Sequence, residues 1–161
     1  MFLTTCSLNI GILSQTNGRF SRILVAVDGS DSSMDAAAFA IQIAKKDHGQ
    51  LIALTVIHIP SSYGLLPSHV LNQWKEKDTL EAQRWFDRIS KDAQENKIPL
   101  KIEFIESSMS VEGAIVNYAE DKNIDLVVIG TRGRSGFKKM LLGSVATGVV
   151  TYATCPVLVV K

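Results

Sequence analysis

Five apolar runs along the chain predict β-strands. Most are apolar throughout, which is typical of strands buried on both faces by helices. In the third run, Lys101 and Glu103 alternate with apolar residues instead. The predicted strands cover residues 21–28, 51–59, 100–105, 125–129 and 156–160.

A helix is predicted after the first strand. Residues 30–33 supply polar cap residues, and Ser32 and Asp35 stand at capping-box spacing. Apolar residues then recur at helical spacing toward Gly49, where the helix is expected to end. Those apolar residues are Met34, Ala37, Ala38, Ile41 and Ala44.

Three further helices are predicted between the later strands. After a loop at residues 61–68, a long charged helix ends near Asn96, and the next begins after Ser110 as its cap. The last helix covers residues 144–152. The inner face of the long charged helix contains Trp74, Ala82, Phe86, Ile89 and Ala93. The inner face of the helix after Ser110 contains Val111, Ala114, Ile115, Tyr118 and Ala119.

Strands that alternate with helices predict an α/β fold. We expect a single-domain three-layer sandwich: a five-stranded parallel sheet with helices on both faces and right-handed crossovers. With 161 residues, 46% of them hydrophobic, the chain is long enough for one domain with a full core. Residues 21–161 are predicted to form that domain, and residues 1–20 a disordered extension rather than a targeting signal, because their first charge is Arg19.

Charge and cysteine content narrow the possible partners. Lysine and arginine total 17 against 16 acidic residues, so no strong field favours a nucleic acid as partner. Cys6 and Cys155 are expected to be unpaired thiols, which fits a reducing, cytoplasmic setting. No apolar run approaches the roughly 20 residues of a membrane span. The three histidines are not spaced like metal ligands, so no metal site is predicted.

A glycine-spaced loop follows the fourth strand. Gly130 and Gly133 are followed nine residues later by Gly143 and Ser144, which open the last helix. Bare backbone N–H groups beside a helix N-terminus can hold phosphate. Arg132 and Arg134 could neutralise its charge, or could equally be ordinary solvated cations. Each glycine also suits an ordinary turn, and Ser144 could simply cap the helix. The spacing matches neither a P-loop nor a dinucleotide fingerprint.

The other strand ends carry further candidates, because ligands of parallel sheets bind beyond the carboxyl ends of the strands. Asp28 ends the first strand and the stretch from Val56 to His58 ends the second. The Asp28 carboxylate can accept hydrogen bonds from ribose hydroxyls, but it could equally orient the turn before Gly29. The local sequence leaves both roles open.

Four segments together resemble the universal stress protein family, over residues 21–161. They are Val-Ala-Val-Asp-Gly-Ser at 25–30, the strand at 125–130, Leu-Gly-Ser-Val at 142–145 and Cys-Pro-Val-Leu-Val-Val at 155–160. In that family the pattern Gly-x2-Gly-x9-Gly-Ser/Thr marks the members that bind ATP, and this chain satisfies it. The resemblance implies an adenine nucleotide alpha hydrolase-like fold and a regulatory role in the stress response.

The resemblance also implies roles for individual residues. Phosphate contacts fall on Gly130, Gly133, Gly143 and Ser144, and ribose or base contacts on Asp28. The backbone of Val56 is expected to meet adenine, and Val145 to add a backbone N–H. The expected ligand is ATP or AMP, with any magnesium held through the phosphates, and the last strand, between Pro156 and Val160, is expected to pair in a homodimer.

Catalysis is not indicated by the residues beside the loop. Neither a general base nor a carboxylate cluster for magnesium stands out, so slow ATP hydrolysis is the most that is expected. One alternative is an adenylyl-chemistry enzyme, but the pyrophosphatase loop Ser-Gly-Gly-x-Asp-Ser is absent at residues 28–32. Another is a protein-interaction module that holds no nucleotide.

Overall fold

The computed structural model describes residues 19–59, 67–133 and 142–161. The predicted loop at residues 61–68 therefore lies almost wholly outside the described residues, as do Arg134, Cys6 and the side chain of Trp74. The elements are β1 (Arg22–Ala26), α1 (Asp31–Asp47), β2 (Gln50–His58), α2 (Ser68–Glu95), β3 (Leu100–Ser107), α3 (Val111–Asp121), β4 (Leu126–Gly130), α4 (Ser144–Tyr152) and β5 (Val157–Val160).

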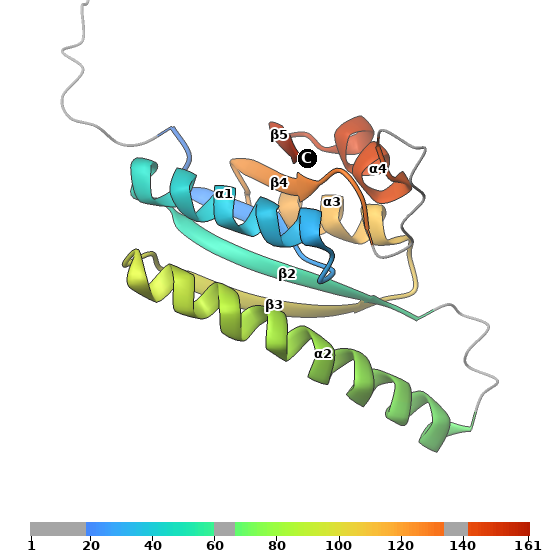
Figure 1. Cartoon of the computed structure of the whole chain (residues 1–161). Coiled ribbons are helices and arrows are strands. Elements are labelled where there is room, and N and C mark those ends of the chain that lie inside the picture. Colours follow the sequence, from blue (N-terminus) through green and yellow to red (C-terminus); the bar gives the residue numbers. More distant parts are fainter. Residues whose placement is uncertain (1–18, 60–66, 134–141) are drawn as a thin grey trace, which may run out of the picture.

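The described strands form one five-stranded parallel sheet in the order β3-β2-β1-β4-β5. This confirms the predicted fold class. The central strand β1 and its neighbour β4 are followed by helices on opposite sides of the sheet, α1 and α4 (Figure 1). Such a switch point opens a crevice at the carboxyl ends of the strands.

Helices cover both faces of the sheet (Figure 1). On one face, α1 and α2 bury a core with Ile23, Val25 and Val128. On the other, α3 and α4 bury Leu24, Val127 and other strand residues. Because successive strand residues point to opposite faces, the continuous apolar runs of β1 and β4 supply both cores at once.

The first helix begins differently from the predicted capping box. Ser30 is the N-cap of α1, and its hydroxyl accepts from the N–H of Ser33 at 3.3 Å. Ser32 lies inside the first turn, where its hydroxyl bonds another segment of the chain. By contrast, Ser110 caps α3 as predicted and accepts from Gly113 N at 3.3 Å.

The folded region begins slightly before the predicted boundary at residue 21. The N–H of Phe20 donates to Asp47 Oδ2 at 3.0 Å, and its ring packs against the core on the α1 side. Phe20 therefore belongs with the domain rather than with the extension. The expectation for residues 1–18 lies outside the described residues.

Among the described helices, none combines the length and the apolar character that crossing a membrane requires. The long α2 has polar and charged residues over most of its surface, and its buried face contains Ala82, Phe86, Ile89 and Ala93.

Candidate functional site

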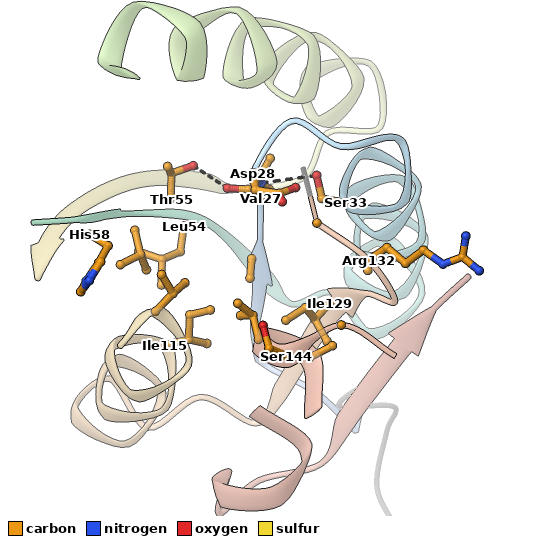
Figure 2. A pocket seen from close by; sticks show the side chains of 18 of the residues that line it. Val27, Asp28, Ser33, Leu54, Thr55, His58, Ile115, Ile129, Arg132 and Ser144 are labelled. Carbon is orange, nitrogen blue, oxygen red and sulfur yellow. Dashed lines mark hydrogen bonds between the residues drawn. The ribbon is translucent and has the colours of Figure 1, made fainter. Parts of the chain in front are cut away.

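A cavity of about 280 Å³ lies beyond the carboxyl ends of β1, β2 and β4, where it meets the start of α4. Figure 2 shows the side chains that surround it. All the predicted site residues that the structure describes line this cavity: Asp28, Val56, Gly130, Arg132, Gly133, Gly143, Ser144 and Val145. The tertiary structure thus brings together residues that are far apart in the sequence.

Two of the loop glycines lie against other parts of the protein. A Cβ on Gly130 would lie 2.7 Å from backbone atoms of Ser32, so only glycine allows β4 to end against α1. A Cβ on Gly133 would lie 2.7 Å from Asp28 Oδ2. Packing against backbone therefore accounts for Gly130 without any ligand, whereas the crowding atom at Gly133 is the end of the Asp28 side chain.

Gly143 is different, because none of the residues that the structure describes requires a glycine there. Its φ of −72° suits any residue, and the nearest protein atom to an added Cβ would be Thr131 O, at an ordinary contact distance of 3.4 Å. Gly143 lines the cavity, so the space that a side chain would take lies beside the place where a ligand would bind.

The ends of the glycine loop are tied together at Thr131. Its N–H donates to Val160 O at 2.8 Å, and its carbonyl accepts from Gly143 N at 2.7 Å. The following residue, Arg132, has a carbonyl that accepts from Ser32 Oγ at 2.6 Å and from Ser30 Oγ at 3.2 Å. The described part of the loop is thus held by α1, β5 and its own far end.

The start of α4 offers backbone donors to the cavity. Gly143 is the N-cap and provides no side chain, so the first turn, with Ser144 and Val145, has no side-chain cap. The N–H groups of a first turn have no partner within the helix, and they carry the positive end of the helix dipole. Ser144 is exposed and lies inside the helix, so it does not act as the N-cap.

Asp28 shapes the turn after β1 and also lines the cavity. Its Oδ1 accepts from Ser30 N at 3.0 Å and from Ser30 Oγ at 2.6 Å, while the next residue, Gly29, has a φ of +80°. Its own N–H donates to Ser33 Oγ at 3.4 Å (Figure 2). The turn role that the sequence left open is therefore observed.

The described charged side chains around the cavity come from three elements or loops. Asp28 follows β1, Asp78 belongs to α2, and Arg132 follows β4. Arg132 is exposed, and Figure 2 shows its guanidinium pointing away from the other cavity residues. Among the residues that the structure describes, no three potential metal-ligating side chains gather in one place.

The model of the universal stress protein family matches residues 19–161. The chain belongs to this family. It is 36% identical over 150 residues to the universal stress protein MJ0531 of Methanocaldococcus jannaschii, covering 93% of this chain and 87% of that protein. It is 32% identical over 149 residues to the universal stress protein YxiE of Bacillus subtilis, covering 88% and 99% of the two chains.

Solved structures of universal stress proteins share the fold. UspA from Lactobacillus plantarum matches with a TM-score of 0.78 and 26% identity, covering 90% of this chain and all of that one. A protein from Archaeoglobus fulgidus in complex with dAMP matches with a TM-score of 0.67 and 20% identity, over 88% and 98% of the two chains. One from Arabidopsis thaliana with AMP bound matches with a TM-score of 0.63 and 14% identity, over 88% and 91%.

Some cavity residues of this universal stress protein had no signal in the sequence. Asp78 and Trp85 reach the cavity from α2, whose helical spacing indicates only which face is buried. Gly29 accommodates Trp85, since an added Cβ would lie 2.1 Å from Trp85 Cε2. Val111 and Ile115 approach from α3. Such contacts depend on how the helices cross the sheet, which local patterns do not encode.

Proposed function

We propose that this universal stress protein binds an adenine nucleotide, ATP or AMP, in the cavity and acts as a regulatory protein of the stress response. Gly143 is the observation that carries the proposal. Neither its backbone conformation nor packing against the described residues requires glycine at that position, yet it stands where an uncapped helix start meets the cavity. A phosphate placed there would take the space that a side chain needs.

The chemistry of the cavity supports an orientation for the nucleotide. Its central lining is apolar, with Leu54, Val56, Ile115 and Ile129, which suits a flat base. Asp28 stands nearer the loop, where its carboxylate would accept from the ribose hydroxyls. The phosphates would then meet the glycine loop and the N–H groups of Ser144 and Val145. Arg134 would be a cationic partner, as would Arg132 once its side chain turns toward the cavity.

Related proteins add independent support. Solved universal stress proteins of the same fold are described in complex with dAMP and with AMP. The glycine pattern of this chain, Gly130, Gly133, Gly143 and Ser144, is the one that the family resemblance associates with ATP. We propose binding rather than efficient catalysis, with slow hydrolysis at most and any magnesium held through the phosphates.

The proposal includes a cytoplasmic homodimer. The last strand, β5, lies at one edge of the sheet, beyond β4. The neighbouring helix α4 exposes Val150 and Tyr152, at 47% and 67%. An edge strand beside exposed apolar residues would be stabilised by pairing with a second copy of this chain.

Two measurements test nucleotide binding. Mass spectrometry of the small molecule released on denaturation should find an adenine nucleotide, and calorimetry with AMP and ATP should give affinities in the micromolar range. If the released fraction contains no nucleotide and neither ligand binds, the protein-interaction module becomes the better description.

Substitution of Gly143 tests whether the ligand binds at the glycine loop. Gly143→Ala should weaken AMP binding by roughly tenfold, about 1.4 kcal/mol, and Gly143→Val should abolish it, because the added atoms take the space of the phosphates. The control Thr151→Val adds no bulk to the cavity, since Thr151 is exposed in the last turn of α4. Unchanged affinity in a folded Gly143→Val protein would remove the loop from the site.

A further inference from the structure

His58 is the last residue of β2 and lines the cavity. Its Nδ1 lies 2.7 Å from the carbonyl oxygen of Met109. A carbonyl can only accept, so Nδ1 carries the hydrogen and donates. In a neutral imidazole the other nitrogen, Nε2, is then an acceptor with a lone pair.

The imidazole is held on a rigid part of the fold. The chain just after it is fixed by the bond from Ile59 N to Ser107 O at 2.9 Å, and His58 is in register with Ser107 of β3. The partner carbonyl belongs to a short turn in which Met109 N donates to Ser107 Oγ at 3.1 Å. Both ring orientation and tautomer are therefore set by neighbours outside the cavity.

His58 stands at the end of the cavity opposite the phosphate loop. Figure 2 shows it on the far side of the view from Arg132, with Ser144 between the two. Val56 is two residues earlier, on the same face of the strand and about 6–7 Å away. A nucleotide whose phosphates occupy the loop and whose base lies beside Val56 would direct its base edge toward His58, because the Watson–Crick edge is remote from the ribose.

We propose that His58 selects the base, by accepting at Nε2 a hydrogen bond from the 6-amino group of adenine. This inference rests on the proposed nucleotide binding and assigns its specificity to one side chain. Purines with a 6-oxo group place an acceptor opposite the same lone pair, which disfavours them. The backbone of Val56 can serve one amino hydrogen and His58 the other.

The test is a double-mutant cycle that removes one protein group, the imidazole of His58, and one ligand group, the 6-amino group of adenine. Binding of AMP and of purine riboside 5′-monophosphate, which lacks only the 6-amino group, is measured by calorimetry at pH 8, where histidine side chains are generally neutral. The variants are wild type, His58→Phe, which keeps a ring without nitrogens, and His69→Phe as a control. His69 is an exposed histidine of α2 that does not line the cavity.

The preference of the wild type for AMP should fall about five- to tenfold in His58→Phe, with little change for the purine riboside. The control should keep the wild-type preference. An unchanged preference for AMP in folded His58→Phe overturns the inference. A wild type that binds AMP and purine riboside 5′-monophosphate equally well also overturns it, and that measurement requires no variant. A wild type that binds neither ligand instead overturns the proposed function itself.

Discussion

Asp125 shows how one carboxylate can join two strands that are remote in the sequence. Its Oδ2 accepts from Ser21 Oγ at 2.6 Å, from Ser21 N at 2.9 Å and from Arg22 N at 2.8 Å. These bonds fix the start of β1 beside the start of β4. Partial burial disfavours the charged form, but the hydrogen bonds and the charge of Arg22 outweigh it and lower the pKa of Asp125.

We predict that Asp125→Asn destabilises the protein in a pH-dependent way. The folded pKa lies below the unfolded value of about 3.9, so the stabilising contribution is present above that pH and is lost as the pH falls through the folded pKa. Urea unfolding at pH 7 should show a loss of about 1–2 kcal/mol, and the loss should shrink toward pH 3.

The matched control for this experiment is Asp121→Asn, an exposed carboxylate at the end of α3. It should change the free energy of unfolding by less than about 0.5 kcal/mol at either pH. A loss for Asp125→Asn that is equally large at pH 3 would mean that the charge does not matter there.

At the scale of elements, the first turn of α1 holds the β4–α4 loop in place. Ser32 Oγ donates to Arg132 O at 2.6 Å, and Arg132 N donates to Ser32 Oγ at 3.4 Å. Ser30, two residues earlier, is the N-cap and bonds Asp28. Ser32 thus makes the shorter bond to the loop, whereas Ser30 chiefly bonds the helix start and Asp28, and its Oγ lies 3.2 Å from Arg132 O.

Substitution of these serines should separate binding from stability. Ser32→Ala should weaken AMP binding several-fold through loss of loop positioning, with a stability change below about 1 kcal/mol. Ser30→Ala removes a cap and should cost about 1–2 kcal/mol in unfolding experiments. Equal effects of both substitutions on affinity and on stability would argue against this division.

At the scale of the whole molecule, β5 determines how two copies could meet. The carbonyls of Pro156 and Val160 accept from Val127 and Thr131, so these alternate residues face β4. Because a strand alternates with a period of two, the backbone groups of Val157 and Val159 face away from the sheet. They form the open edge of the structure on that side.

We predict that Val159→Pro shifts the protein from dimer toward monomer. Proline removes an outward-facing N–H while the bonds of β5 to β4 remain, so the fold and the cavity should persist. Light scattering at tens of micromolar, on the order of the range in which weak pairing persists, measures the change. Ile102→Ala on the opposite edge strand should leave the mass unchanged. A wild-type monomer under these conditions would exclude the dimer.

Many of the residues that line the candidate site could be predicted, because they belong to short local motifs at the ends of strands. Strand ends and glycine spacing located Asp28, Val56 and the loop residues, since parallel strands bring their carboxyl ends to one edge of the sheet. Asp78 and Trp85 could not be predicted in the same way. Their helix reaches the cavity only through the angle at which it crosses the sheet.

The sequence by itself determined the alternation of strands and helices, because apolar periodicity is local. It thereby determined the parallel sheet, because strands joined through a crossover helix run parallel. Only the tertiary structure decided that Ser32 bonds Arg132 rather than capping α1, and that Gly130 packs against Ser32 while no described residue crowds Gly143. Ser32 and Arg132 are 100 residues apart. Contacts at that separation depend on how surfaces pack, and no local pattern of residue types records them.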